Sequence, residues 1–316
     1  MHFKAIKILK KLLMLQKIKL ILCSNNQARK SILCILSYFW LFPVLLSAQD
    51  TITGMVCNHD TKEKIAYVSI GVSEKDFGTV SDLHGRFYLK KSENILSTDS
   101  VIFSNIGFKV KKHTVADLDN CDTIFLMPVT YELPEVVVKK SKTRERILGR
   151  DISSSGLLHV NFYSIHDNPK ESFSRERGIL VKVNNSCIIN TLNFQIGSNN
   201  SDTVKFRLNF YTVENDLPKD ILVNKDIIFE VINKRKGWFS LDLRPYYIFI
   251  EGGQKVAVTL TLLDENTKEK KRRYFSFAGA FTLNSTLYFR EKAMSSWKVT
   301  KGAAISFYLD ATFYLN

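Results

Sequence analysis

The sequence predicts an all-β protein made of two β-sandwich domains. Three observations lead to this prediction. Apolar and polar residues alternate in short runs along residues 52–316, which is the period of a half-buried strand. Turn residues such as Gly, Asn, Asp and Pro separate the runs, and no helical period of similar length competes with them. A charged and then Ser-rich stretch, residues 139–156, divides the runs into a first domain, residues 50–138, and a second, residues 157–316.

The first domain is predicted to be a small sandwich of seven strands. Its clearest strand places apolar side chains on one face and small or polar residues on the other: Val68, Ile70 and Val72 against Ser69, Gly71 and Ser73. Asp accepts hydrogen bonds from nearby backbone N–H groups, and Gly adopts positive φ at little cost. We therefore interpret Asp82, His84 and Gly85 as a surface hairpin turn rather than as a ligand site.

Four ordered elements mark residues 52–138. They are an Ile-x-Gly-x-Val strand, a Gly-Thr-x-x-Asp-x-x-Gly-x-Phe block, an Ile-Gly-Phe strand end and a closing Leu-x-Glu-Val-Val-Val segment. The residues that carry them are Ile52, Gly54, Val56, Gly78, Thr79, Asp82, Gly85, Phe87, Ile106, Gly107, Phe108, Leu133, Glu135, Val136, Val137 and Val138. In this order the elements resemble the carboxypeptidase-regulatory-like domain, a small β-sandwich found at the front of many bacterial outer-membrane proteins.

The resemblance implies an accessory module without catalytic activity, in a protein of the cell envelope. In SusC-like TonB-dependent receptors this module precedes a plug and a large barrel. Here a charged stretch follows Val138, and about 160 residues then remain. That is too few for a plug and a barrel of that size, so we expect an envelope protein of another kind and not a transporter.

The second domain has about nine strand candidates. They are residues 179–183, 188–196, 204–210, 227–232, 239–243, 256–262, 274–277, 287–289 and 305–313. Burying five inward apolar side chains contributes ~7–15 kcal/mol, whereas ordering the backbone of a ten-residue strand costs ~10–20 kcal/mol. Each strand therefore needs partners and a second sheet over its apolar face, so we expect a two-sheet sandwich of jelly-roll type.

Residues 1–49 are predicted to be an N-terminal extension followed by a helical signal peptide. A positive start, an apolar run and small residues before a cut after position 48 or 49 are typical of such leaders. These features are carried by Arg29, Lys30, residues 32–46, Ser47 and Ala48. We therefore expect an exported protein that is located in the periplasm, on the outer-membrane surface or outside the cell.

An uncleaved anchor helix is the alternative for the same residues. The apolar run is short for a membrane span of ~20 residues, and it contains Pro43. Residues 1–28 form a basic, apolar segment much longer than a usual n-region. We therefore expect translation to start later than Met1.

The charge of the chain does not indicate a nucleic-acid partner. The chain has 45 Lys+Arg and 31 Asp+Glu, but eight of the basic residues and none of the acidic ones precede residue 49. The remaining 37 basic and 31 acidic residues give a net charge of +6, which is too mild to predict nucleic-acid binding. The basic residues of 139–156 would suit a peripheral contact with anionic lipid, but charge runs usually serve solubility, and we interpret the stretch as a solvated linker.

Three cysteines follow the leader, Cys57, Cys121 and Cys187, and they lack the Cys-x-x-Cys spacing of a metal site. The first and last strands of a small sandwich can be neighbours and the periplasm is oxidising, so a Cys57–Cys121 disulfide is one alternative. In the other, which we favour slightly, all three are buried thiols that behave as small hydrophobic residues.

The sequence lacks the motifs of common hydrolases. A zinc carboxypeptidase needs a His-x-x-Glu pair and a distant His, and none of the five histidines after the leader has a Glu three residues later. No His-Glu-x-x-His, Gly-x-Ser-x-Gly elbow or phosphate-binding Gly loop occurs. We therefore expect no enzymatic activity, cofactor or metal. Because the paired carboxylates of a glycosidase can be distant in sequence, a glycan-acting hydrolase is the alternative.

Four aromatic residues are candidates for stacking on sugar rings: Trp238, Tyr246, Tyr247 and Trp297. They form a ligand platform only if they are exposed together, and the competing interpretation, which we favour, buries at least two of them. The expected role is therefore binding or structural, with another envelope protein or a polysaccharide as the partner. A carbohydrate-binding module in the second sandwich is the related alternative.

Export through this leader predicts a mature N-terminus at Gln49 or Asp50, because small residues precede those positions. N-terminal sequencing of the exported protein measures it. A mature N-terminus upstream of Arg29 would contradict both the late start and the leader.

Overall fold

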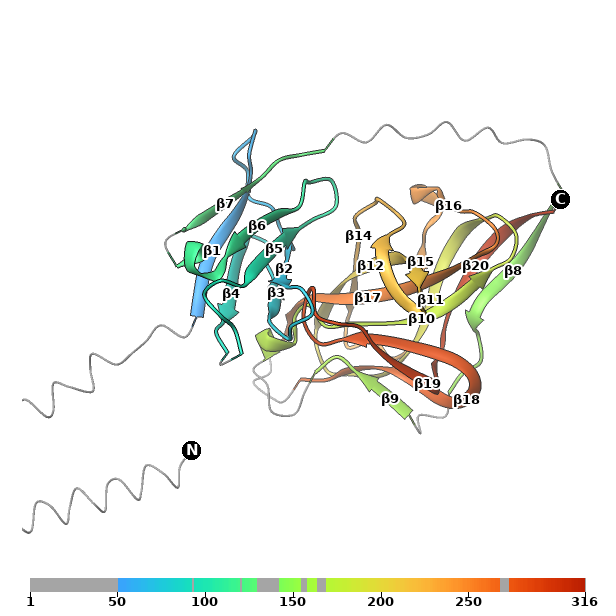
Figure 1. Cartoon of the computed structure of the whole chain (residues 1–316). Coiled ribbons are helices and arrows are strands. Elements are labelled where there is room, and N and C mark those ends of the chain that lie inside the picture. Colours follow the sequence, from blue (N-terminus) through green and yellow to red (C-terminus); the bar gives the residue numbers. More distant parts are fainter. Residues whose placement is uncertain are drawn as a thin grey trace, which may run out of the picture. The chain divides into compact units, whose positions relative to one another are not determined.

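The computed structural model describes residues 51–129 and 142–315, apart from residues 93, 120, 155–157, 164–168 and 268–272. The predicted leader and the closing Leu-x-Glu-Val-Val-Val segment lie outside the described residues. Most of the described residues are in β-strands, which confirms the expected all-β class (Figure 1). Among them, no helix has the length and apolar character needed to span a membrane.

The first domain is a sandwich of two sheets. Its described part contains the seven expected strands and one helical turn, α3 (Val115–Leu118). The strands are β1 (Thr51–Asn58), β2 (Ser69–Val72), β3 (Gly78–Val80), β4 (Arg86–Lys90), β5 (Ser100–Ser104), β6 (Lys111–Thr114) and β7 (Thr123–Leu126). One sheet has the order β4-β1-β7 and the other β3-β2-β5-β6, so β3 is an edge strand.

Apolar side chains of both sheets form the core of this sandwich. Phe87 on β4 and Phe103 on β5 are buried and meet edge to face, with ring centroids 5.6 Å apart. The expected turn before β4 is present, because Asp82 Oδ1 accepts hydrogen bonds from the backbone N–H groups of His84 and Arg86 at 2.8 and 2.9 Å. Gly85 completes the turn with a φ of 72°, a conformation that favours glycine.

The second domain is built from longer strands. They are β8 (Lys142–Arg150), β9 (Leu158–Asn161), β10 (Glu176–Val183), β11 (Cys187–Asn199), β12 (Thr203–Glu214), β13 (Leu217–Ile221), β14 (Ile227–Ile232), β15 (Gly237–Asp242), β16 (Ile248–Ile250), β17 (Gln254–Asn266), β18 (Phe275–Arg290), β19 (Lys298–Ile305) and β20 (Phe307–Leu315). Two 3₁₀ turns, η2 (Pro169–Ser172) and η3 (Arg244–Tyr246), accompany them. The strand order is β13-β12-β17-β10-β18-β11-β20-β8; β14 also pairs with β12, β15 and β16 with β11, and β9 and β19 with β18.

Phenylalanine rings fill the centre of the second core. The buried phenylalanines of this core are Phe162, Phe194, Phe206, Phe210, Phe229, Phe239, Phe275, Phe277, Phe307 and Phe313. Phe194 on β11 lies against Phe229, Phe239, Phe277 and Phe307, with ring centroids 5.0–6.2 Å apart. One face of each long strand therefore contributes to a single core, as the alternating pattern predicted.

The prediction of a solvated linker at 139–156 is wrong for its central part. Residues Lys142–Arg150 form β8, which pairs antiparallel with β20 along its whole length. Only Leu148 of this strand is buried, because β8 lies at the end of the strand order, and edge strands commonly carry charges that prevent further pairing. The second sandwich therefore begins at Lys142 and not at residue 157.

The number of strands in the second domain also differs from the expected nine. Its described part contains thirteen, and the candidates 274–277 and 287–289 belong to one strand, β18. A bulge between Phe281 and Thr286 interrupts the pairing of β18 with β19. Phe281 and Leu283 are 76% and 97% exposed there, so the alternating pattern breaks although the strand continues.

Replacing Phe194 by Ala is expected to lower the free energy of unfolding by about 3–5 kcal/mol, because neighbouring rings cannot fill the cavity. Chemical denaturation of the mature chain measures the change. Phe281→Ala removes an exposed ring and is the matched control, with an expected change within about 0.5 kcal/mol. Equal effects of the two variants would contradict the central place of Phe194.

Candidate functional site

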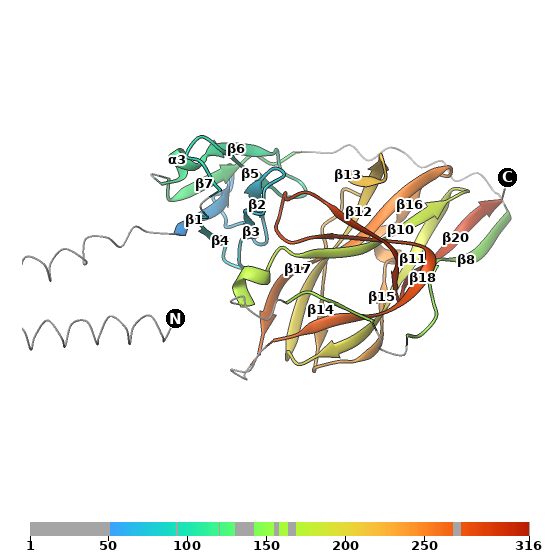
Figure 2. The ribbon, with the colours of Figure 1, turned by 60° about the horizontal axis from the view of Figure 1, so that its bottom comes forward.

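The two sandwiches belong to one compact unit, residues Thr51–Asn316, and they meet along an interdomain seam. The first sandwich contributes the β2–β3 hairpin and neighbouring residues. The second contributes β12 and residues 291–297, the segment between β18 and β19. Figure 2 shows this dark red segment beside β2 and β3.

Two glycines allow the close approach at the seam. A Cβ atom added at Gly71 on β2 or Gly78 on β3 would lie 2.2 or 2.4 Å from the carbonyl oxygen of Ala293. Any side chain at either position would therefore push the segment 291–297 away. The backbone N–H of Glu74 donates a hydrogen bond to the carbonyl oxygen of Met294 at 3.0 Å, which fixes the segment on the hairpin.

Arg207 on β12 connects the seam from the other side. Its guanidinium donates hydrogen bonds to the carbonyl oxygen of Tyr67 at 2.9 Å and to Asn105 Oδ1 at 3.1 Å, both in the first sandwich. The same group pairs with Asp226 at 2.6 Å. Lys205 Nζ donates to the Tyr67 hydroxyl at 3.0 Å. A planar guanidinium with several donors suits this arrangement, because one side chain can satisfy acceptors on two domains.

Apolar contacts exclude water from the same region. Tyr67 and Val80 of the first sandwich form a buried cluster with Leu263 on β17. Partly buried side chains surround it: Ala66, Phe173 and Ile228. Shielding from water strengthens the neighbouring charged hydrogen bonds of Arg207.

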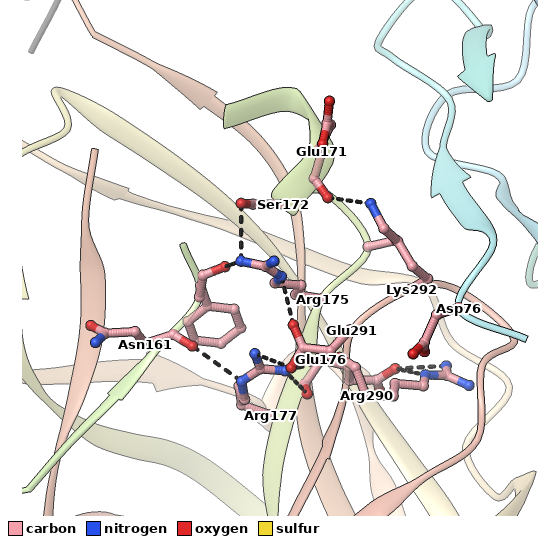
Figure 3. Close-up of polar contacts among 12 residues, drawn as sticks. Asp76, Asn161, Glu171, Ser172, Arg175, Glu176, Arg177, Arg290, Glu291 and Lys292 are labelled. Carbon is pink, nitrogen blue, oxygen red and sulfur yellow. Dashed lines mark hydrogen bonds and ion pairs between the residues drawn. The ribbon is translucent and has the colours of Figure 1, made fainter. Parts of the chain in front are cut away.

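A buried charge network lies directly before Ala293 (Figure 3). The carboxylate of Glu176 on β10 is fully buried. It accepts a hydrogen bond from Arg290 Nε at 2.8 Å and one from Asn209 Nδ2 at 2.8 Å. The Thr259 hydroxyl also donates to it. Arg290 further donates to the Tyr211 hydroxyl at 3.0 Å, so the last residue of β18 is held by groups on two other strands, β10 and β12.

Glu291, the next residue, is held by two buried arginines. Its carboxylate oxygens lie 2.7 Å from Arg175 Nε and 2.8 Å from Arg177 Nη2. Burial lowers the pKa of Arg177 to about 10, and the Glu291 carboxylate opposes this shift. Ala293 N then donates to Ser174 Oγ at 3.0 Å. The charges thus determine the path of the chain that reaches Gly71 and Gly78.

The network is arranged for position rather than for proton transfer. Both oxygens of Glu176 accept hydrogen bonds from fixed donors. A general acid or base must instead exchange a proton with a substrate within hydrogen-bond reach. Among the described residues, no group of three or more His, Cys, Asp or Glu side chains is arranged to hold a metal ion.

A comparison with protein families decides the nature of the first sandwich. Residues 52–138 match the family model of the CarboxypepD_reg-like domain. The first sandwich is a CarboxypepD_reg-like domain. The match confirms the resemblance seen in the four sequence elements, and it ends before the second sandwich begins. A search of curated proteins finds no match to the chain.

The seam uses a residue of the CarboxypepD_reg-like motif itself. Gly78 is the first residue of the Gly-Thr-x-x-Asp-x-x-Gly-x-Phe block. Because it has no side chain, its backbone lies close to the backbone of Ala293. One face of the β2–β3 hairpin is thereby covered by the second sandwich at Gly71 and Gly78. The motif of the CarboxypepD_reg-like domain therefore contributes to domain docking in this chain.

The structure does not bring the four predicted stacking residues together. Trp238 on β15 meets Tyr308 edge to face at 5.4 Å, and its indole N–H donates to Ser153 Oγ at 2.9 Å. Trp297 is partly buried and lies over the guanidinium of Arg290, 4.4 Å from its ring centroid. In the described residues no ring contact joins Trp238 to Trp297.

The two tyrosines also differ from each other. Tyr246 is partly buried and packs against the second core. Tyr247 is 78% exposed, with a left-handed φ of 45°. A single platform of these four rings is therefore not formed. The expected burial of at least two of them is not found either, because Trp238, Tyr246 and Trp297 are only partly buried.

The cysteines are free thiols in the structure, so the alternative of a Cys57–Cys121 disulfide is wrong. Cys57 on β1 lies opposite Phe125 on β7 in the parallel register. Cys121 precedes Phe125 by four residues, which corresponds to about 13 Å along a strand. This separation exceeds the usual Cα–Cα distance of a disulfide, about 4.4–6.8 Å.

The seam residues could not be found from the alternating pattern. Lys205, Arg207 and Asn209 occupy the polar positions of β12, where we expected solvent. Instead Arg207 and Asn209 are buried and Lys205 is partly buried. The length of the Lys205 and Arg207 side chains could have indicated a contact between domains, because long charged side chains can reach acceptors on another domain.

Gly78→Ala is expected to lower the free energy of unfolding of the mature chain by about 1–3 kcal/mol, because the new methyl group overpacks the seam. Amide hydrogen exchange gives a local readout: the Glu74 N–H, which donates to Met294, should exchange faster. Thr79→Ala on the same strand is the control and should leave exchange at Glu74 unchanged. Unchanged protection of Glu74 in Gly78→Ala would contradict the docking role of this glycine.

Proposed function

We propose that this chain is an exported protein of the cell envelope with a binding or structural role and without catalytic activity. In it, the CarboxypepD_reg-like domain is an accessory module that braces the second sandwich. The second sandwich makes the contact with an external partner, either another surface protein or a glycan.

The seam is the observation that supports this proposal most directly. The face of the CarboxypepD_reg-like domain around Gly71, Gly78 and Asn105 is occupied by the second sandwich. A module used in this way stabilises and orients its neighbour. The leader-like residues 29–49 support export, and the mild net charge of the remaining chain argues against a nucleic-acid partner.

A glycan-acting hydrolase is the competing proposal for the second sandwich. It requires one carboxylic acid and one carboxylate on opposite sides of a sugar. Glu176, a fully buried carboxylate, is engaged by Arg290 and by neutral donors. Its engagement supports a structural role for this group, so we retain binding without hydrolysis as the proposal.

Cell fractionation tests export. A bacterial host producing the full chain should contain a shortened protein outside the cytoplasm. Leu45→Arg combined with Leu46→Arg interrupts the apolar run and should leave the full-length chain in the cytoplasm. Leu283→Arg, at an exposed position of the second sandwich, is the control and should be exported. Cytoplasmic retention of the unaltered chain would overturn the proposal.

An assay of reducing ends tests the absence of hydrolysis. The purified mature chain is incubated with neutral and anionic polysaccharides, and the release of reducing ends is measured over time. No release above the buffer control is expected. Release that is lost on substitution of a single carboxylate in the second sandwich would instead favour the hydrolase.

A further inference from the structure

The outer face of the β15/β16–β11–β20–β8 sheet combines aromatic rings with fixed polar groups. The core side of these strands is occupied by residues such as Phe239, Leu192 and Leu309. Alternation places their sequence neighbours on the opposite face. We call this the ring-flanked face and define it by Asn193, Trp238, Phe249, Tyr308, Asp310 and Tyr314.

Strand register arranges these residues in rows across the sheet. Asn193 on β11 lies opposite Ser240 on one side and opposite Tyr308 on the other. In the next row, Thr191 lies between Asp242 and Asp310. The polar groups therefore form a continuous patch over three strands.

Hydrogen bonds hold the central polar groups in place. Asn193 Nδ2 donates to Asp310 Oδ2 at 2.8 Å, and the Thr191 hydroxyl donates to the same oxygen. The Ser240 hydroxyl donates to Asn193 Oδ1. No described residue donates a hydrogen bond to Asp310 Oδ1. The carboxylate is thus oriented by the sheet while one oxygen is left to accept a hydrogen bond from a ligand.

Rings stand at both ends of the polar patch. Trp238 and Tyr308 meet at one end, with centroids 5.4 Å apart, and Phe249 and Tyr314 at the other, 6.4 Å apart. Tyr308 and Tyr314 are six residues apart on β20, which corresponds to about 20 Å along the strand. The face therefore has the length of an extended chain molecule rather than of a single small ring.

The residue opposite Tyr308 on the neighbouring strand is a glycine, Gly149 on β8. A Cβ atom at this position would lie 2.5 Å from the carbonyl oxygen of Phe307, and its φ is 111°. Close approach and backbone conformation both require glycine here, so β8 has no side chain at the position opposite Tyr308.

The charges of the face disfavour an anionic partner. Glu145, Asp242 and Asp310 contribute carboxylates to it. Arg244 pairs with Asp242 at 2.8 Å, and the exposed guanidinium of Arg146 is directed to the ring of Phe313 at 5.9 Å, on the core side of β20. Burial and the nearby Asp310 raise the pKa of Tyr308, so its phenol stays a neutral donor.

We propose that the ring-flanked face binds an extended neutral polysaccharide, with the Trp238–Tyr308 and Phe249–Tyr314 pairs against sugar rings. Asp310 Oδ1 accepts hydrogen bonds from sugar hydroxyl groups, and the buried Asn193 orients the Asp310 carboxylate. Sugar hydroxyls supply the donors that Asp310 Oδ1 accepts, and the apolar sides of sugar rings suit aromatic contacts. This inference rests on the proposed binding function and names its ligand class. Anionic polymers and lipid surfaces are disfavoured by the carboxylates.

The mature chain can be tested on an array of neutral and anionic glycans and, separately, on vesicles of anionic phospholipid. Neutral glycans of several units should bind, and the dissociation constant for the best of them is then measured by calorimetry. Tyr308→Ala removes a ring, and Asp310→Asn replaces the acceptor while keeping its size. Each variant should weaken binding about tenfold or more, with the circular dichroism spectrum unchanged.

Phe281→Ala is the matched control, because it removes an exposed ring from β18, outside the ring-flanked face. It should bind like the unaltered chain. Binding only to anionic glycans or vesicles, neutral binding that survives both variants, or no binding to the array would each overturn the inference. Export of the chain would be unaffected by any of these results, so the proposed envelope location is tested separately by fractionation.

Discussion

The ion pair between Arg290 and Glu176 fixes the end of β18. The contact between the two sandwiches depends on where this strand ends. Charges this deeply buried cost several kcal/mol to desolvate, and removing one partner of such a pair typically costs about 3–5 kcal/mol. Here the cost is offset by a full set of hydrogen bonds to Glu176. The result is a β18 strand whose end has one defined position, from which Ala293 reaches the CarboxypepD_reg-like domain.

The two sandwiches are joined by two kinds of contact, one at Ala293 and one at Arg207. On the Ala293 side, missing side chains at Gly71 and Gly78 allow backbone to meet backbone. On the Arg207 side, a long side chain crosses between domains and finds carbonyl and amide oxygens. Both sets of contacts join residues of the first sandwich to residues of the second. They therefore stabilise the two sandwiches as a joined pair. The proposed ligand surface, the sheet of β11 and β20 with its partly exposed rings, is a different part of the second sandwich.

The alternation of apolar and polar residues predicted most strands, because a strand with one buried face shows this pattern in its own sequence. It failed where burial depends on distant segments. β8 has only Leu148 as a buried residue, so its strand character comes from pairing with β20. β12 is buried on both faces, and its charged residues gave no sign of this. The CarboxypepD_reg-like domain was found from its turn glycines. The arrangement of the four candidate stacking residues could not be predicted, because Trp297 and Trp238 pack against rings on other strands.

The contact between Ala293 and the β2–β3 hairpin has a consequence for the order of events during synthesis. Chains are made from the N-terminus, so the CarboxypepD_reg-like domain can fold before residues 290–293 exist. During that interval the face of the hairpin at Gly71 and Gly78 has no partner from the second sandwich. Synthesis of the segment after β18 then brings Ala293 onto this face. The final third of the sequence thus completes the packing of a surface that the first third presents much earlier.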